Sequence, residues 1–119
     1  MSVRQVAQCP KELAYLPCHE RFEWFRLGDA RGDYAVLGLA EAGEDCLELH
    51  LEVTSWGLRA RKGLARDMDW LREYARACGK SRILGLKGGE EMDPVWAKFT
   101  RLYGFTGYAV VQTAYLDVD

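Results

Sequence analysis

The sequence predicts a single α/β domain, 1–119, built on a parallel or mixed sheet. The chain has 119 residues, of which 49% are hydrophobic and 29% are charged, a balance typical of one globular domain. An alternating strand over Leu47 to Val53, an amphipathic helix and a short apolar strand over Ser81 to Lys87 follow one another. A strand, a helix and a second strand in this order predict a right-handed crossover between parallel strands.

The N-terminal half predicts shorter elements. Val3 to Ala7 favours a first strand, and the aromatic segment Pro10 to Phe25 is interpreted as one or two short helices. Arg31-Gly32-Asp33 is a turn signal, and Tyr34 to Ala40 predicts a strand that leads through a hairpin into Leu47 to Val53.

The C-terminal half predicts two helices and a β-rich tail. The first helix is expected to begin near Gly63 and to end at Gly79, because apolar residues recur between them at three- and four-residue spacing. The second opens near Pro94 and is closed by Gly104. Phe105 to Val118 is rich in β-forming residues and predicts one or two final strands, whose exposed edge is a candidate interface for a homodimer.

Composition excludes several classes of function. The formal net charge is -2, whereas a domain that binds nucleic acid usually carries a basic excess. No apolar run is long enough to span a membrane and no signal peptide is present, so we expect a cytoplasmic protein. The spacing of Cys9, Cys18 and His19 matches no common zinc pattern, so we expect reduced thiols and no metal.

A basic segment precedes the apolar stripe of the first predicted helix. Arg59, Arg61 and Lys62 lie there beside Gly63. The first turn of a helix has unpaired N–H groups and a partial positive charge, which together favour a phosphate. Glycine would let a phosphate oxygen approach the backbone, and the cations would add charge around it. The segment predicts an anion site, with a solvated basic loop as the alternative.

The segment Ala60-Arg61-Lys62-Gly63-Leu64-Ala65 resembles the pyrophosphate loop of the GNAT acetyltransferase superfamily, which has the form Gln/Arg-x-x-Gly-x-Gly/Ala. The resemblance extends from Leu47 to about Asp117, because a strand, a helix and a closing Gly104-Phe105 follow in the family's order. It implies a GNAT-like central mixed sheet of about five to seven strands flanked by helices. Compact chains of this kind are similar to GNAT-like proteins of phages and mobile elements.

The resemblance also implies a cofactor and a reaction. Acetyl-coenzyme A (acetyl-CoA) would be the co-substrate, with its pantetheine arm between Leu51 to Thr54 and Leu84 to Leu86. The reaction would transfer the acetyl group to a primary amine. The candidates for binding the cofactor are Val53, Arg59, Arg61, Lys62, Gly63, Leu64 and Ala65.

Proton transfer needs further side chains. An amine must lose a proton as it attacks, so a carboxylate or imidazole is the expected base. Glu52 is the first candidate and His50 the second, since both lie on the polar face of the alternating strand, and the alternative is that they only form its wetted side. Thr100 stands where the family has a tyrosine acid and is a poor proton donor. Tyr103 or Tyr108 is the candidate replacement.

Three functions remain open from the sequence. The first is an N-acetyltransferase that acts on a small-molecule or protein amine of unknown identity. The second is a catalytically silent GNAT-like structural or protein-binding module that retains coenzyme A (CoA), motivated by Thr100 and by the short segment between Val6 and Tyr34. The third is an α/β domain that binds another phosphorylated ligand at the same helix.

Overall fold

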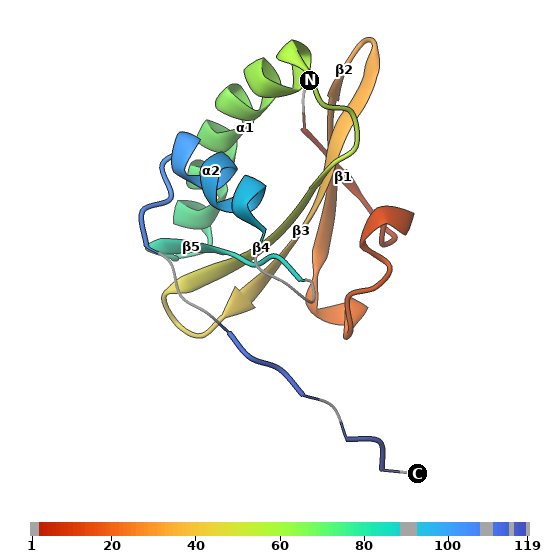
Figure 1. Cartoon of the computed structure of the whole chain (residues 1–119), viewed down its shortest axis with the longest axis vertical. Helices are drawn as coiled ribbons and strands as arrows, with labels where there is room; N and C mark the ends of the chain where they lie inside the picture. The colour runs from red at the N-terminus through yellow and green to blue at the C-terminus, as the bar shows by residue number, and fades with distance from the viewer. Residues whose placement is uncertain (1–2, 89–92, 108–110, 115, 119) are drawn as a thin grey trace. The chain divides into compact units, whose positions relative to one another are not determined.

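The computed structural model describes residues 3–88, 93–107, 111–114 and 116–118. Contacts divide the chain into two compact units, Met1–Gly88 and Gly89–Asp119, and each is described by itself. The first unit holds a five-stranded sheet, a long helix and two short 3-10 helices (Figure 1). None of the helices that the structure describes is long and apolar enough to cross a membrane.

The sheet is mixed, as the sequence predicts. Its strands, in their spatial order, are β1 (Val3–Val6), β2 (Glu23–Asp29), β3 (Gly32–Ala42), β4 (Cys46–Val53) and β5 (Arg82–Gly85). Neighbouring strands are antiparallel from β1 to β4, whereas β4 and β5 are parallel. The helix α1 (Leu58–Ala77) connects these two parallel strands, so the predicted crossover is present.

The two faces of the sheet are covered by different elements. The helix α1 packs on one face (Figure 1). Its residues Leu64 and Leu71 are at most 1% exposed. On the other face η1 (Lys11–Leu13) contacts β3 and β4, and η2 (His19–Arg21) precedes β2. A buried apolar cluster lies on this second side: Leu13, Leu16, Phe22, Trp24, Val36 and Ala40.

The strand β2 was not predicted, because the sequence interpretation assigned Pro10 to Phe25 to short helices. Its interior residues are almost all buried, including Trp24, Phe25 and Leu27. A strand covered on both faces loses the alternation of apolar and polar residues by which a half-buried strand is recognised. Its aromatic residues therefore indicated burial without indicating a strand.

The predicted strands after Phe105 are absent from the described part of that segment, which is 105–107, 111–114 and 116–118. Residues 108–110, 115 and 119 lie outside the described residues. Val111, Leu116 and Val118 are exposed. A composition rich in β-forming residues stabilises a strand only where a neighbour pairs with it. The homodimer expected through this tail stays a prediction, and the described residues of the segment form no strand.

The second unit contains α2 (Pro94–Leu102), which the sequence predicts. The Asp93 carboxylate caps the helix by accepting hydrogen bonds from the backbone N–H groups of Val95 (2.9 Å) and Trp96 (3.4 Å). Pro94 occupies the first position of the helix, where its missing N–H costs nothing. The Phe99 ring lies 5.0 Å from the ring of Tyr103.

Candidate functional site

The two parallel strands separate before β4 ends. Their pairing runs from Cys46 and Arg82 to Leu49 and Gly85. Within the described residues up to 88, the last hydrogen bond between the two segments joins the Leu86 N–H to the Leu49 carbonyl (3.0 Å). Backbone groups of alternate residues point to the same side of a strand. The N–H and C=O groups of Leu51 and Val53 therefore point to the side of β4 on which β5 was paired, beyond the point where that pairing ends.

The gap leads to the beginning of α1. The Thr54 and Ser55 N–H groups both bond to the Tyr34 carbonyl (2.8 and 3.2 Å), and Gly57, with φ 142°, precedes the helix. The first helical hydrogen bond runs from the Arg61 N–H to the Gly57 carbonyl (3.1 Å). The N–H groups of Leu58, Arg59 and Ala60, here called the first-turn amides, have no acceptor within the helix.

The predicted helix start near Gly63 is wrong, since α1 begins at Leu58. Leu, Arg, Ala and Lys are strong helix formers, so nothing between Gly57 and Gly63 stops the helix. Gly63 is then the sixth helical residue, and its N–H takes part in the regular pattern of the helix. The free amides expected at a helix start therefore belong to the first-turn amides, and the cofactor-binding role assigned to Gly63 stays a prediction.

Gly63 has a packing role in the structure. A Cβ at this position would lie 2.6 Å from Cε1 of Tyr34, whose side chain is almost fully buried. The β2–β3 register shifts between Leu27 and Gly28, which leaves Tyr34 without a partner in β2 and re-aims its side chain. Its hydroxyl donates to the buried carboxylate of Asp67 on α1. Burial, and then this hydrogen bond, raise the pKa of Tyr34 far above its ordinary value.

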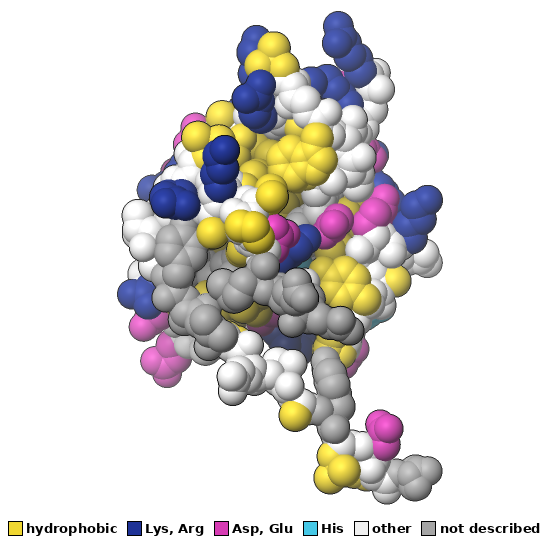
Figure 2. All heavy atoms as spheres, viewed as in Figure 1, with side chains coloured by type: hydrophobic (Ala, Val, Ile, Leu, Met, Phe, Trp, Pro, Cys, Tyr) yellow, Lys and Arg dark blue, Asp and Glu magenta, His cyan; other side chains and the backbone are white. Residues whose placement is uncertain are grey.

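The cations near the first turn are not equivalent. The Arg59 guanidinium donates to Oδ1 of Asp29 (2.7 Å) and to the Gly32 carbonyl (2.9 Å), so it ties α1 to the β2–β3 hairpin. Arg61 and Lys62 are exposed, as is the neighbouring Ala65, whereas Leu64 is buried. Figure 2 shows Lys and Arg side chains gathered around the end of the molecule where α1 begins.

The polar face of β4 carries Glu48, His50 and Glu52, as predicted. His50 Nε2 lies 2.6 Å from Oε2 of Glu48, whose other oxygen accepts a hydrogen bond from Arg21 (2.9 Å). A carboxylate only accepts, so His50 Nε2 carries a proton, and in the neutral ring Nδ1 is a bare acceptor. Nδ1 is buried and has no hydrogen-bond partner among the residues that the structure describes. His50 is therefore held in place but presents no accessible nitrogen.

Glu52 is the accessible member of this face. Its side chain is 36% exposed, and its Oε2 lies 3.6 Å from Lys87 Nζ. Tyr15, on the segment after η1, is close enough that the charge of Glu52 adds to the effect of burial in raising the pKa of its phenol. The sequence interpretation missed Tyr15, because no local pattern indicates that a residue 37 positions away lies beside Glu52.

No protein-family model matches the sequence, and no curated protein matches it. Solved structures do. An aminoglycoside N-acetyltransferase, AAC(6')-Iy, in complex with CoA aligns with a TM-score of 0.68 at 13% identity, over 98% of this chain and 99% of that one. The chain has the GNAT acetyltransferase fold. The aminoglycoside acetyltransferase meta-AAC0020 from an uncultured soil metagenomic sample aligns with a TM-score of 0.62 at 12% identity, over 96% of this chain and 77% of that one. The putative acetyltransferase YycN from Bacillus subtilis aligns with a TM-score of 0.56 at 16% identity, over 90% of this chain and 71% of that one.

The remaining candidates of this GNAT-fold chain lie in the second unit. Thr100 is buried, and its hydroxyl donates to the Ala97 carbonyl (3.1 Å). Tyr103 caps the end of α2, where its ring lies against Phe99. Tyr108 lies outside the described residues. The acid role assigned to Tyr103 remains a prediction, and Thr100 uses its proton within its own helix.

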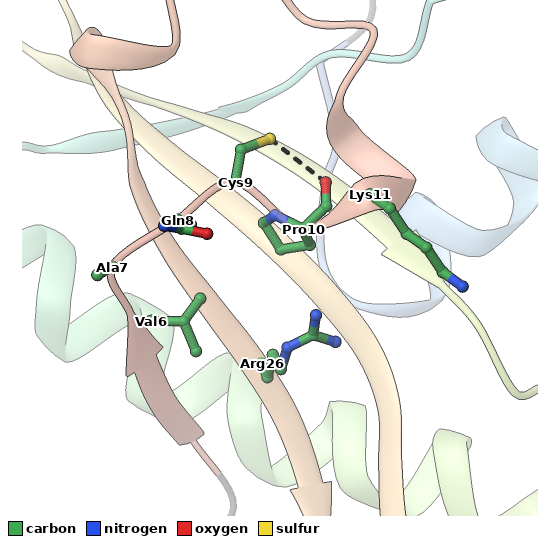
Figure 3. A pocket seen from close by; sticks show the side chains of 7 residues that line it. All are labelled: Val6, Ala7, Gln8, Cys9, Pro10, Lys11 and Arg26. Carbon is green, nitrogen blue, oxygen red and sulfur yellow. Dashed lines mark hydrogen bonds between the residues drawn. The ribbon is translucent and has the colours of Figure 1, made fainter.

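A shallow hollow lies at the opposite edge of the sheet, beside β1 (Figure 3). It is lined by Val6, Ala7, Gln8, Cys9, Pro10, Lys11 and Arg26. The Cys9 thiol donates to the Pro10 carbonyl (3.3 Å), and burial raises its pKa, so the thiol stays protonated. Among the described residues, no three His, Cys, Asp or Glu side chains gather as a metal site.

Proposed function

We propose that this chain is an N-acetyltransferase that transfers the acetyl group of acetyl-CoA to a primary amine. The observation that carries the proposal is the order of backbone groups along the chain from the end of the β4–β5 pairing to the first turn of α1. Backbone groups of Leu51 and Val53 face the side of β4 where its pairing with β5 has stopped, and the first-turn amides follow at the start of α1. This order suits a ligand with amide groups in its middle and a diphosphate at one end.

The residues present fit CoA. The backbone groups of Leu51 and Val53 offer donors and acceptors for the amides of the pantetheine arm. The first-turn amides and the positive end of α1 suit the diphosphate, and Arg61 and Lys62 add charge nearby. When bound, acetyl-CoA supplies the acetyl group as a thioester.

Glu52 is the proposed base. It is accessible, and it lies on the strand whose edge borders the gap. An incoming ammonium must first lose a proton, and the Glu52 carboxylate accepts it directly or through one water. His50 is the second candidate, but Nδ1 must first become accessible, because Nε2 is already bonded to Glu48. The proposal places the protein in the cytoplasm, where its free thiols stay reduced.

Ligand binding and thiol release test this proposal. Thermal shifts with CoA, acetyl-CoA and ATP are expected to show stabilisation by the two coenzymes only, because a ligand that binds the folded state raises the melting temperature. Stabilisation by ATP alone would favour a different phosphorylated ligand. Thiol release from acetyl-CoA with a panel of primary amines is expected for the wild type, and Glu52→Gln is expected to lower kcat by about 10²-fold or more without weakening CoA binding.

A second candidate function is a silent module that binds CoA. The observation in its favour is that the Thr100 hydroxyl is buried and bonded to its own helix. Tight CoA binding without thiol release for any amine is the result that this alternative predicts.

A further inference from the structure

The proposed reaction needs a proton for its leaving group as well as a base for its nucleophile. The amine nitrogen forms a bond to the acetyl carbon, the carbon–sulfur bond breaks, and the sulfur leaves with the electron pair. A thiol has an ordinary pKa of about 8.5, so a nearby acid that protonates the sulfur lowers the barrier.

Tyr15 lies at the end of the sheet where β4 and β5 separate. Its ring borders the backbone that follows β5, since a methyl group on Gly88 would lie 4.0 Å from its Cε2. The residue before Gly88 is Lys87, whose Nζ lies 3.6 Å from Oε2 of Glu52. Tyr15 is 60% exposed, so a large part of the residue is open to solvent.

We propose that Tyr15 donates the proton to the departing sulfur, an inference that rests on the proposed acetyl transfer. Glu52 first takes a proton from the ammonium and releases it to solvent. As the nitrogen–carbon bond forms, the amine nitrogen loses a second proton to the Glu52 carboxylate, and the phenol proton passes to the sulfur. The phenolate then recovers a proton from Glu52 or from solvent. The net result is one proton moved from the amine to the thiol, so that both residues return to their starting states.

The two side chains are electrostatically coupled in the direction that this scheme needs. The negative charge of Glu52 adds to burial in raising the pKa of Tyr15, so the phenol is fully protonated in the resting protein. When Glu52 accepts the amine proton, that charge is neutralised. Tyr15 then becomes a stronger acid at the stage when the thiolate forms.

A pH titration without any cofactor tests this coupling. The near-ultraviolet absorbance of tyrosinate in the wild type, minus that of Tyr15→Phe, isolates the titration of Tyr15. Its midpoint is expected to lie above the ordinary value of about 10 and to fall toward it in Glu52→Gln. Glu41→Gln is the matched control, because Glu41 is an exposed carboxylate paired with Lys80, and it should leave the midpoint unchanged. A midpoint that does not move in Glu52→Gln overturns the coupling.

Kinetics then test the acid role. Tyr15→Phe is expected to lower kcat by about 10²-fold or more, to keep the CoA dissociation constant within about two-fold, and to abolish the fall in kcat at high pH. Tyr74→Phe is the control, because the hydroxyl of Tyr74 bonds to Glu23. A kcat for Tyr15→Phe within about two-fold of an active wild type overturns the acid role alone. A wild type that releases no thiol with any amine overturns the acetyl transfer itself, whatever the titration shows.

Discussion

Replacing Gly63 with alanine separates the packing role of this glycine from a role in holding phosphate. The new Cβ would lie 2.6 Å from Cε1, 2.7 Å from Cζ and 2.9 Å from the hydroxyl oxygen of Tyr34. These separations are shorter than van der Waals contacts. Tyr34 is only 1% exposed and is fixed by its bond to Asp67, so its ring cannot move aside freely.

The expected loss follows from two opposing effects. Overpacking of a core costs about 1–3 kcal/mol. Alanine within a helix gains about 1 kcal/mol over glycine. Because three atoms are overlapped, the upper part of the first range applies, and the net loss for Gly63→Ala is about 1–2 kcal/mol. For a domain of this size, that loss lowers the melting temperature by about 4–8 °C.

Calorimetry and CoA titration together decide between the two roles. Ala65→Gly, at an exposed position of the same helix, calibrates the contribution of helix propensity. We expect Gly63→Ala to lose stability while its CoA affinity per folded molecule is unchanged. A variant that gains stability by the propensity effect but binds CoA at least tenfold more weakly would refute the packing argument and return the phosphate site to Gly63.

Three further substitutions test contacts within the two units. Tyr34→Phe is expected to cost about 1–3 kcal/mol, because it removes a buried hydrogen bond to Asp67. Because burial raises the Tyr34 pKa, the wild type should also lose stability as the pH rises above about 10, the ordinary tyrosine pKa. The urea midpoint of Tyr34→Phe should fall less than that of the wild type over the same pH range. Arg59→Ala should destabilise the β2–β3 hairpin most at neutral pH. The Arg31 N–H and the Arg59 guanidinium both depress the pKa of Asp29. The stabilisation that the Asp29 carboxylate provides is therefore lost as the pH falls through that depressed pKa. Equal urea midpoint losses at neutral and acidic pH would contradict it. Asp93→Ala should destabilise α2 by about 1 kcal/mol, and unchanged amide exchange at Val95 would count against the cap.

The sequence predicted the elements whose patterns are local. The alternation over Leu47 to Val53 and the apolar stripe before Gly79 correspond to β4 and α1. The start of α1 was misplaced because Gly63 was taken as a helix boundary, although the residues from Leu58 onward are good helix formers. Only the contact with Tyr34 explains why a glycine stands inside the helix.

The candidate site was predictable in part for the same reason. The shared face of Glu48, His50 and Glu52 follows from the period of a strand. His50 is bonded to Glu48, whereas Glu52 remains accessible. This difference depends on Arg21 and on the segments that cover the sheet, which strand periodicity does not predict. Tyr15 was not predictable, because its position beside Glu52 and Gly88 arises from tertiary packing alone.

The most direct test of the proposed CoA site is an amide-resolved nuclear magnetic resonance titration of the wild type with CoA. The largest changes in chemical shift are expected at the N–H groups of Leu51, Val53, Arg59 and Ala60, because these groups face the open edge or begin α1. Saturable binding that leaves these amides unmoved, or that changes the Gly63 amide most, would contradict the proposed position of the diphosphate.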